Sequence, residues 1–212
     1  MSDKKLFIYA YDALCGWCYG FSTVMEKVNA EWKDRLDFEV LSGGMMQGVR
    51  SGPIGVVAPY VKTAYKTVEE RTGIKFGEGF INNILEPGTA VLNSIPPAIA
   101  LSVFKSYFPD KQIQFASALQ KAINYDGIDM EDFLSYKKYA EDFGIDGNEF
   151  VSKMSKETYL LESNRDFQMC ANLGVTGFPA AFILKDEVYH QVAKGYIPFE
   201  QINDIIKTVM ES

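Results

Sequence analysis

The sequence predicts an α/β protein in which helices cover both faces of a small sheet. Two observations lead to this prediction: the chain opens with a β-α-β pattern and closes with an α-β-β-α pattern. Between the two patterns, apolar residues recur at helical spacings and no strand is indicated. We therefore expect a discontinuous α/β domain formed by residues 1–50 and 155–212, with an all-helical insertion at 51–154.

The opening of the chain alternates between strand and helix patterns. Residues 5–11 are apolar and aromatic, as expected for a strand that is buried on both faces. From Gly16 onward, apolar residues recur at spacings of three and four, which predicts a helix. Residues 36–41 alternate between apolar and polar before Ser42-Gly43-Gly44, which predicts a second strand. Cys15 thus lies where the first strand gives way to the helix.

The middle of the chain carries helix signals. We expect one helix from Pro53 to Gly73, then a Gly-rich irregular stretch at 73–88. Pro97 is expected to open the next helix, and residues 113–123 form another apolar stripe at helical spacing. The N-cap candidates of two further helices are Asp129 and Asp146.

The last part of the chain returns to mixed structure. A helix is expected to end near Leu173, because Gly174 follows it. Two strands at 180–184 and 187–193 form a predicted hairpin around Lys185-Asp186, and Pro198 suits the first turn of a final helix.

Charge and hydropathy exclude several classes of partner. The chain has a formal net charge of −7 and its basic residues are scattered, so we expect no nucleic-acid partner. No apolar stretch approaches the roughly 20 residues that span a bilayer, so we expect no membrane partner. Lys4-Lys5 precede an apolar run at 6–11, but the run is too short for a signal peptide and no cleavage site follows it. We therefore expect a cytoplasmic protein.

The motif Cys15-Gly16-Trp17-Cys18 is the strongest chemical signal in the sequence. A thiolate is the species that attacks a disulfide. At the first turn of a helix, free backbone N–H groups and the helix dipole stabilise negative charge, which favours a thiolate on Cys15. Cys18 lies one turn further along the same helix face, close enough to form a disulfide with Cys15. The motif therefore predicts a dithiol in which Cys15 attacks and Cys18 resolves.

Two other roles for this cysteine pair are less well supported. A structural zinc site usually needs four Cys or His ligands, but only Cys170 and His190 remain, and neither has the required spacing. A purely structural disulfide gains little stability from closing so small a loop. We therefore expect no metal. Cys170 is expected to be a buried free thiol, with an extra resolving or regulatory role as the alternative.

A second motif lies directly before the strand at 180–184. The sequence Gly174-Val175-Thr176-Gly177-Phe178-Pro179 has glycines that allow unusual dihedral angles, and a proline at the start of the strand. Together with the cysteine motif after the first strand, this resembles the DsbA-like family of thioredoxin-fold proteins, over nearly the whole chain. Asp12 and Ser42-Gly43-Gly44 resemble the cytoplasmic FrnE-type branch of protein-disulfide isomerases.

The resemblance implies a thioredoxin-like fold in which the helical block is an insertion. It implies that the Phe178–Pro179 bond is cis, although most X-Pro bonds are trans. It also implies that Pro179 packs against the two cysteines and that the backbone of Phe178 pairs with a bound substrate peptide.

The sequence also departs from the resemblance. Thioredoxin carries a buried acid six residues before its first motif cysteine, and Tyr9 occupies that place here. Another group, with water and Asp12 as the candidates, must then accept the proton of Cys18. No His lies between the cysteines, so the strongly oxidising character that it gives some relatives is not expected. Trp17 is a candidate substrate contact, with core packing as the alternative.

The leading functional prediction is thiol–disulfide exchange with protein or small-molecule disulfides. No cofactor is expected beyond the dithiol, with glutathione as a candidate redox partner. One alternative is a glutathione-dependent isomerase or transferase of the kappa or 2-hydroxychromene-2-carboxylate isomerase type. Those enzymes generally have Ser at the first motif position and need no second cysteine. A second alternative is a non-catalytic peptide-binding module.

Overall fold

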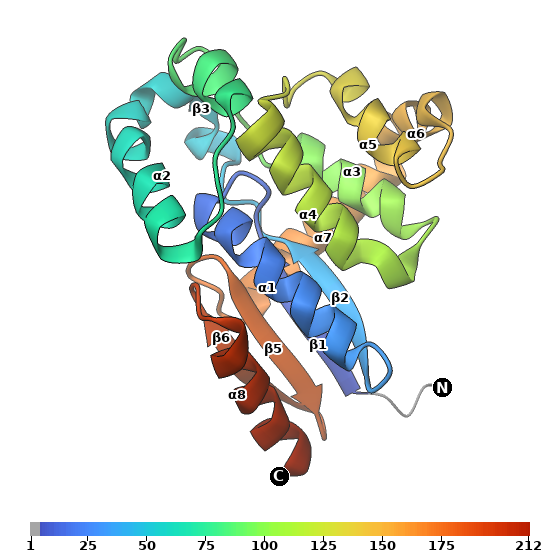
Figure 1. Cartoon of the computed structure of the whole chain (residues 1–212). Coiled ribbons are helices and arrows are strands. Elements are labelled where there is room, and N and C mark those ends of the chain that lie inside the picture. The colour runs from blue at the N-terminus through green and yellow to red at the C-terminus, as the bar shows by residue number, and fades with distance from the viewer. Residues whose placement is uncertain (1–4) are drawn as a thin grey trace.

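Figure 1 shows the computed structural model of the chain, which describes residues 5–212. Lys4 of the Lys4-Lys5 pair lies outside the described residues. The main sheet has four strands in the order β2-β1-β5-β6. Parallel pairing joins β1 (Lys5–Tyr11) to β2 (Leu36–Ser42), and antiparallel pairing joins β1 to β5 (Ala180–Lys185) and β5 to β6 (Val188–Lys194). Both ends of the chain therefore build one sheet, as predicted.

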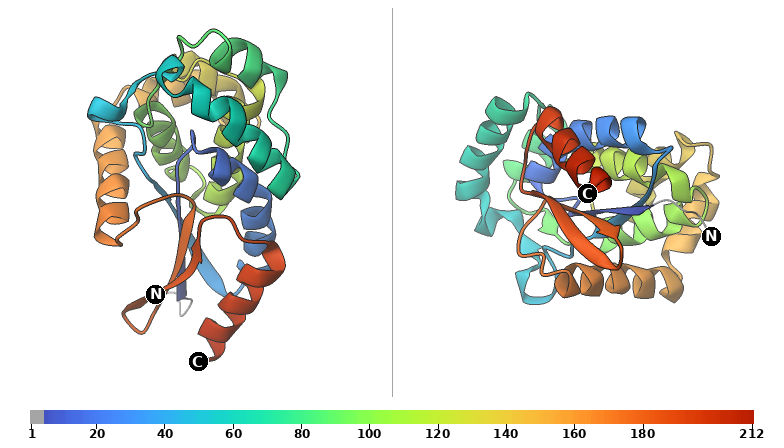
Figure 2. Two further views of the ribbon diagram at one scale, coloured as in Figure 1. Left: turned by 90° about the vertical axis from the view of Figure 1, so that its left-hand side faces the viewer. Right: turned by 90° about the horizontal axis from the view of Figure 1, so that it is seen from below.

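Helices cover both faces of this sheet. Figure 2 shows α1 (Gly16–Trp32) and α8 (Phe199–Glu211) on one face and α7 (Glu157–Asn172) on the other. The alternation of side chains along β1 explains the two layers. Its residues Phe7, Tyr9 and Tyr11 belong to the larger core with α1, whereas Ile8 and Ala10 belong to a smaller core with α7. The predicted α/β fold with a thioredoxin-like connectivity is confirmed.

The remaining α-helices gather at the end of the sheet where β1 ends (Figure 1). They are α2 (Ala58–Thr72), α3 (Ile95–Lys105), α4 (Gln112–Lys121), α5 (Lys137–Glu141) and α6 (Gly147–Met154). None of the helices within residues 5–212 is long and apolar enough to cross a membrane. The helical block is therefore placed directly above the turn that leads into Cys15.

The expectation that this block contains no strand is wrong at one point. A two-residue strand, β3 (Gly52–Pro53), pairs antiparallel with β4 (Val91–Leu92). Strands of two residues are too short to produce an alternating pattern in the sequence. Pro53, the predicted helix start, lies in β3, and α2 begins only at Ala58. The division of the chain into separate units at 51 and 154 stays a prediction.

Other local differences concern helix ends and turns. A π-helical segment, Phe80–Leu85, occupies part of the stretch expected to be irregular, and a second one, Ala122–Asp126, extends α4. The N-cap expected at Asp129 lies instead at Asp132, whose side chain accepts from the Leu134 amide at 2.9 Å. Asp146 caps α6 as predicted, since it accepts from an amide of the first turn at 2.8 Å.

The hairpin turn also lies one residue later than predicted. Asp186 and Glu187 are the turn residues, with φ of 49° and 64°, and Lys185 belongs to β5. The strands themselves lie within one residue of the predicted ranges at each end.

The end of the second π-helical segment is held by a close backbone approach. Gly127 has φ +67°, and a Cβ atom there would overlap the backbone carbonyl of Gly79. The amide nitrogen of Gly77 donates to the carbonyl oxygen of Asn124 at 3.1 Å in the same region. These contacts fix the segment 122–126 against residues 77–79, at the start of the first π-helical segment.

We expect Gly127→Ala to lower the free energy of unfolding by about 2–4 kcal/mol, because it adds a backbone overlap to the cost of positive φ. Gly73→Ala is the matched control: Gly73 has φ +77°, but open space surrounds its Cβ position. That variant should lose only about 1 kcal/mol. Urea denaturation monitored by circular dichroism measures the free energy of unfolding of both variants. Equal losses in the two variants would contradict the role of the contact.

Candidate active site

Cys15 lies at the junction between β1 and α1. Its amide nitrogen donates to the carbonyl oxygen of Asp12 at 3.1 Å, which closes a tight turn after the strand. Cys15 is the N-cap residue of α1 with an extended backbone (φ −77°, ψ 112°), and its side chain makes no capping hydrogen bond. The sulfur therefore lies at the positive end of the helix and is available for chemistry.

The buried carboxylate of Asp12 holds this turn in place. One of its oxygens accepts from the Leu14 amide at 3.1 Å and the other from the Met45 amide at 2.8 Å. Burial raises the pKa of Asp12, and these hydrogen bonds oppose the shift. Asp12 thus ties the approach to Cys15 to the segment after β2. Its candidate role as proton acceptor for Cys18 stays a prediction.

Cys18 is fully buried one turn behind Cys15. Burial raises the pKa of the Cys18 thiol well above its ordinary value, and the hydrogen bond and charge of Cys15 raise it further. The Cys18 thiol is therefore protonated at neutral pH. Once the Cys15 sulfur is bonded to another sulfur, it has no charge, and the Cys18 thiol loses its proton more readily.

Tyr9 takes the position where thioredoxin has a buried acid. Its side chain is buried in the same core as Cys18, and no hydrogen bond of good geometry within residues 5–212 reaches its hydroxyl. Burial raises the pKa of Tyr9 well above its ordinary value, and negative charge on Cys18 and Cys15 adds to the shift. A neutral phenol therefore replaces an ionisable carboxyl beneath the dithiol.

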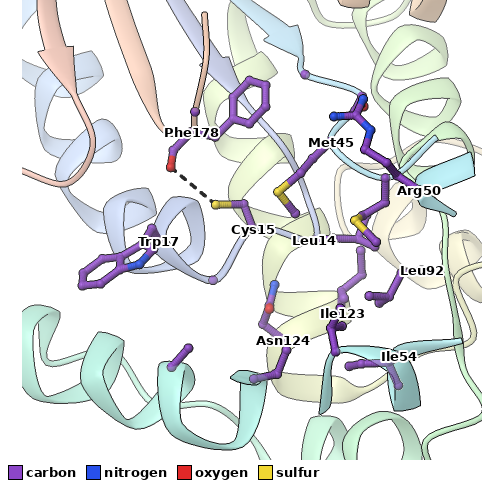
Figure 3. Close-up of a pocket in the computed structure, with 18 of the residues that line it drawn as sticks. Leu14, Cys15, Trp17, Met45, Arg50, Ile54, Leu92, Ile123, Asn124 and Phe178 are labelled. Carbon is purple, nitrogen blue, oxygen red and sulfur yellow. Dashed lines mark hydrogen bonds between the residues drawn. The ribbon is translucent and has the colours of Figure 1, made fainter. Parts of the chain in front are cut away.

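The segment before β5 lies against Cys15. The Phe178–Pro179 peptide bond is cis, as the resemblance implied. The thiol of Cys15 donates to the carbonyl oxygen of Phe178 across 3.6 Å, which Figure 3 marks with a dashed line. The ring of Phe178 occupies the space where a Cβ of Gly43 would lie, so only glycine fits beneath it. The two motifs thus meet, and the role of Phe178 and Pro179 in substrate binding stays a prediction.

Trp17 is half-buried beside the dithiol. Its ring centroid lies 6.4 Å from that of Tyr196 in the segment after β6, so the side chain packs within the protein. Trp17 also contributes to the wall of the cavity next to Cys15. Figure 3 shows it on the other side of Cys15 from Met45. Trp17 therefore both packs inside the protein and borders the cavity. Its contact with substrate stays a prediction.

A cavity of about 620 Å³ opens beside Cys15. Its volume lies within the range of ligand pockets, roughly 300–1,000 Å³. The wall includes residues that sequence reasoning missed, among them Met45, Arg50 and Asn124 (Figure 3). These residues follow no motif. The signal nearest to them was Ser42-Gly43-Gly44, which ends β2 and begins the segment that carries Met45.

Cys170 lies on α7, and its thiol donates to the carbonyl oxygen of Ser42 across 3.6 Å. Burial, followed by the charge of Asp166, raises the pKa of Cys170 to about 12. Its thiol is therefore protonated at neutral pH. Within residues 5–212, no group of three or more His, Cys, Asp or Glu side chains could hold a metal ion.

We expect iodoacetamide to label Cys15 first in the reduced native protein at pH 8, because Cys18 and Cys170 hold their protons. With a pKa of about 12, Cys170 is ionised in only about one molecule in 10⁴ at that pH. Peptide mapping by mass spectrometry measures the order. The variant Cys170→Ser should label at the same initial rate as the wild type. If Cys18 or Cys170 were labelled as fast as Cys15, the predicted difference in reactivity between the three thiols would be wrong.

Solved structures with a similar fold cover almost the whole chain. A "putative protein disulfide isomerase" from Nitrosomonas europaea is 23% identical, with a TM-score of 0.88 over 99% of this chain and 98% of its own. Two structures of the cytosolic disulfide reductase DsbM from Pseudomonas aeruginosa, the second with GSH, are 22% and 20% identical. They match with TM-scores of 0.79 and 0.77 over 98% of this chain and 100% of theirs.

A 2-hydroxychromene-2-carboxylate isomerase is a more distant structural neighbour. It is 13% identical, with a TM-score of 0.65 over 97% of this chain and 94% of its own. At these identities the structures establish similarity of fold alone. No curated protein sequence matches the chain. The family model for the DSBA-like thioredoxin domain matches residues 8–207. The chain therefore belongs to the DSBA-like thioredoxin domain family.

Proposed function

We propose that the protein is a thiol–disulfide oxidoreductase that acts on protein or small-molecule disulfides through Cys15 and Cys18. The proposal rests on the different surroundings of the two thiols. The Cys15 side chain keeps 8% exposure and lines a cavity at the start of α1 beside the Phe178 carbonyl, whereas Cys18 behind it is 0% exposed. Membership of the DSBA-like family supports the same chemistry.

The proposed reaction proceeds in two exchanges. The Cys15 thiolate attacks one sulfur of the substrate disulfide, and the other substrate sulfur leaves as a thiolate that takes a proton. Cys18 then loses its proton and attacks the Cys15 sulfur. The second substrate thiol leaves, and a Cys15–Cys18 disulfide remains. Two electrons have passed to the substrate, and the reverse sequence oxidises a substrate dithiol.

Glutathione is the proposed redox partner, and no other cofactor enters the proposal. Two glutathione thiols would reduce the Cys15–Cys18 disulfide and leave as glutathione disulfide. The structure of DsbM with GSH supports glutathione as a ligand of this fold. We further propose a cytoplasmic location, which the similarity to the cytosolic DsbM reductase supports. Trp17, Phe178 and Pro179 are the proposed substrate contacts.

We expect Cys15→Ser to abolish reduction of insulin and of glutathionylated peptides, because the attacking sulfur is lost. Cys18→Ser should accumulate a mixed disulfide with the substrate at Cys15, visible as a mass shift without reductant. The control Cys170→Ser should retain the wild-type rate. Activity that survives Cys15→Ser would overturn the assignment.

The same variants separate the alternative functions. A glutathione-dependent isomerase or transferase would turn over an aromatic electrophile in Cys18→Ala as fast as in the wild type. A non-catalytic binding module would form no Cys15–Cys18 disulfide at accessible potentials. The proposal requires the opposite result in both measurements.

A further inference from the structure

The cavity beside Cys15 is larger and more apolar than thiol–disulfide exchange by itself requires. Its walls include the start of α1, the segment after β2, α2, the two π-helical segments, α7 and the segment before β5. Most of its interior is formed by aliphatic and aromatic side chains, including Ile54, Val61, Val68, Phe80, Ile84 and Ile123. An extended polypeptide placed there would leave backbone N–H and C=O groups without partners, at a cost of about 1–3 kcal/mol each. The interior therefore favours a small apolar group.

The charge of the cavity wall is the opposite of the charge of the protein. The chain carries a net charge of −7 with 28 acidic residues, yet Arg50 is the one charged side chain among the described residues that line the cavity. One guanidinium nitrogen of Arg50 donates to the Gly44 carbonyl oxygen at 3.2 Å, which fixes the side chain. Arginine has further N–H donors that suit a carboxylate. Figure 3 shows the Arg50 side chain across Met45 from Cys15.

We propose that the cavity binds a small disulfide or thiol substrate with an apolar, aromatic or branched body and a carboxylate. The body fills the apolar interior, the carboxylate meets Arg50, and the sulfur lies at Cys15. This inference rests on the proposed function and narrows its substrate class to apolar organic acids that carry sulfur.

The chemical step is balanced with glutathione as the reductant. Cys15 attacks the substrate disulfide, one substrate thiol leaves, and Cys18 releases the second by forming the Cys15–Cys18 bond. Two glutathione molecules then reduce this bond and become glutathione disulfide. The substrate gains two electrons and two protons in total.

Binding is tested first with ligands that contain no sulfur. 2-Naphthoate and 2-naphthamide have the same ring system and differ in charge. We expect calorimetry with the reduced protein to give a Kd for naphthoate about tenfold lower than for naphthamide. Arg50→Gln should remove that difference, whereas Arg71→Gln, an exposed arginine of α2 outside the cavity wall, should preserve it.

Occupancy of the cavity is tested by filling it. Val61 is half-buried on α2 and lines the cavity, so Val61→Trp should weaken binding of both naphthyl ligands at least tenfold. Circular dichroism and the urea midpoint check that the variant is folded. If it does not fold, the Arg50→Gln comparison decides. Equal binding of the two ligands to the wild type would overturn the inference.

Turnover separates this inference from the proposed function. With glutathione, bis(4-carboxyphenyl) disulfide should have a kcat/KM about tenfold above that of bis(4-carbamoylphenyl) disulfide, mainly through KM. Arg50→Gln should make the two substrates equal. Equal rates in the wild type, with loss of both in Cys15→Ser, would refute the inference and leave the proposed function standing. Reduction that persists in Cys15→Ser would refute the proposed function itself.

Discussion

The antiparallel pairing of β1 with β5 is the constraint on which the site depends. It places Ala10 opposite Ala180, so the chain leaving β1 and the chain entering β5 meet at the same end of the sheet. The Cys15 sulfur thereby lies 3.6 Å from the Phe178 carbonyl oxygen, although the two residues are 163 positions apart in sequence. The hydrogen bond from the Met45 amide to the Asp12 carboxylate and the packing of the Phe178 ring against Gly43 then hold the two segments against the end of β2.

The same arrangement gives the two motif thiols different surroundings. Cys15 is the N-cap residue of α1 and lines a cavity, whereas Cys18 is fully buried with Tyr9 in the main core. Burial holds the proton on Cys18, and the charge of Cys15 strengthens that hold. In the proposed reaction, the Cys18 thiol therefore becomes easier to deprotonate once Cys15 is covalently bonded, and this orders the two exchanges without a carboxyl at the position of Tyr9.

The sequence predicted the features that depend on local pattern or on family resemblance. The position of Cys15 followed from a strand pattern directly before a helix pattern, and the cis bond at Pro179 followed from the resemblance. The N-cap was misplaced because Asp129 and Asp132 each accept from the amide two residues later, so spacing alone does not separate them. Arg50 could not be found, because tertiary packing alone brings it to the cavity.

The most direct test of the central claim is a redox titration of the Cys15–Cys18 pair. The protein is equilibrated in mixtures of reduced and oxidised glutathione, quenched by alkylation and mapped by mass spectrometry. The account predicts one two-electron transition that joins Cys15 to Cys18, which persists in Cys170→Ser and disappears in Cys18→Ser. Three free thiols at every glutathione ratio, or a disulfide that uses Cys170 in place of Cys18, would contradict it.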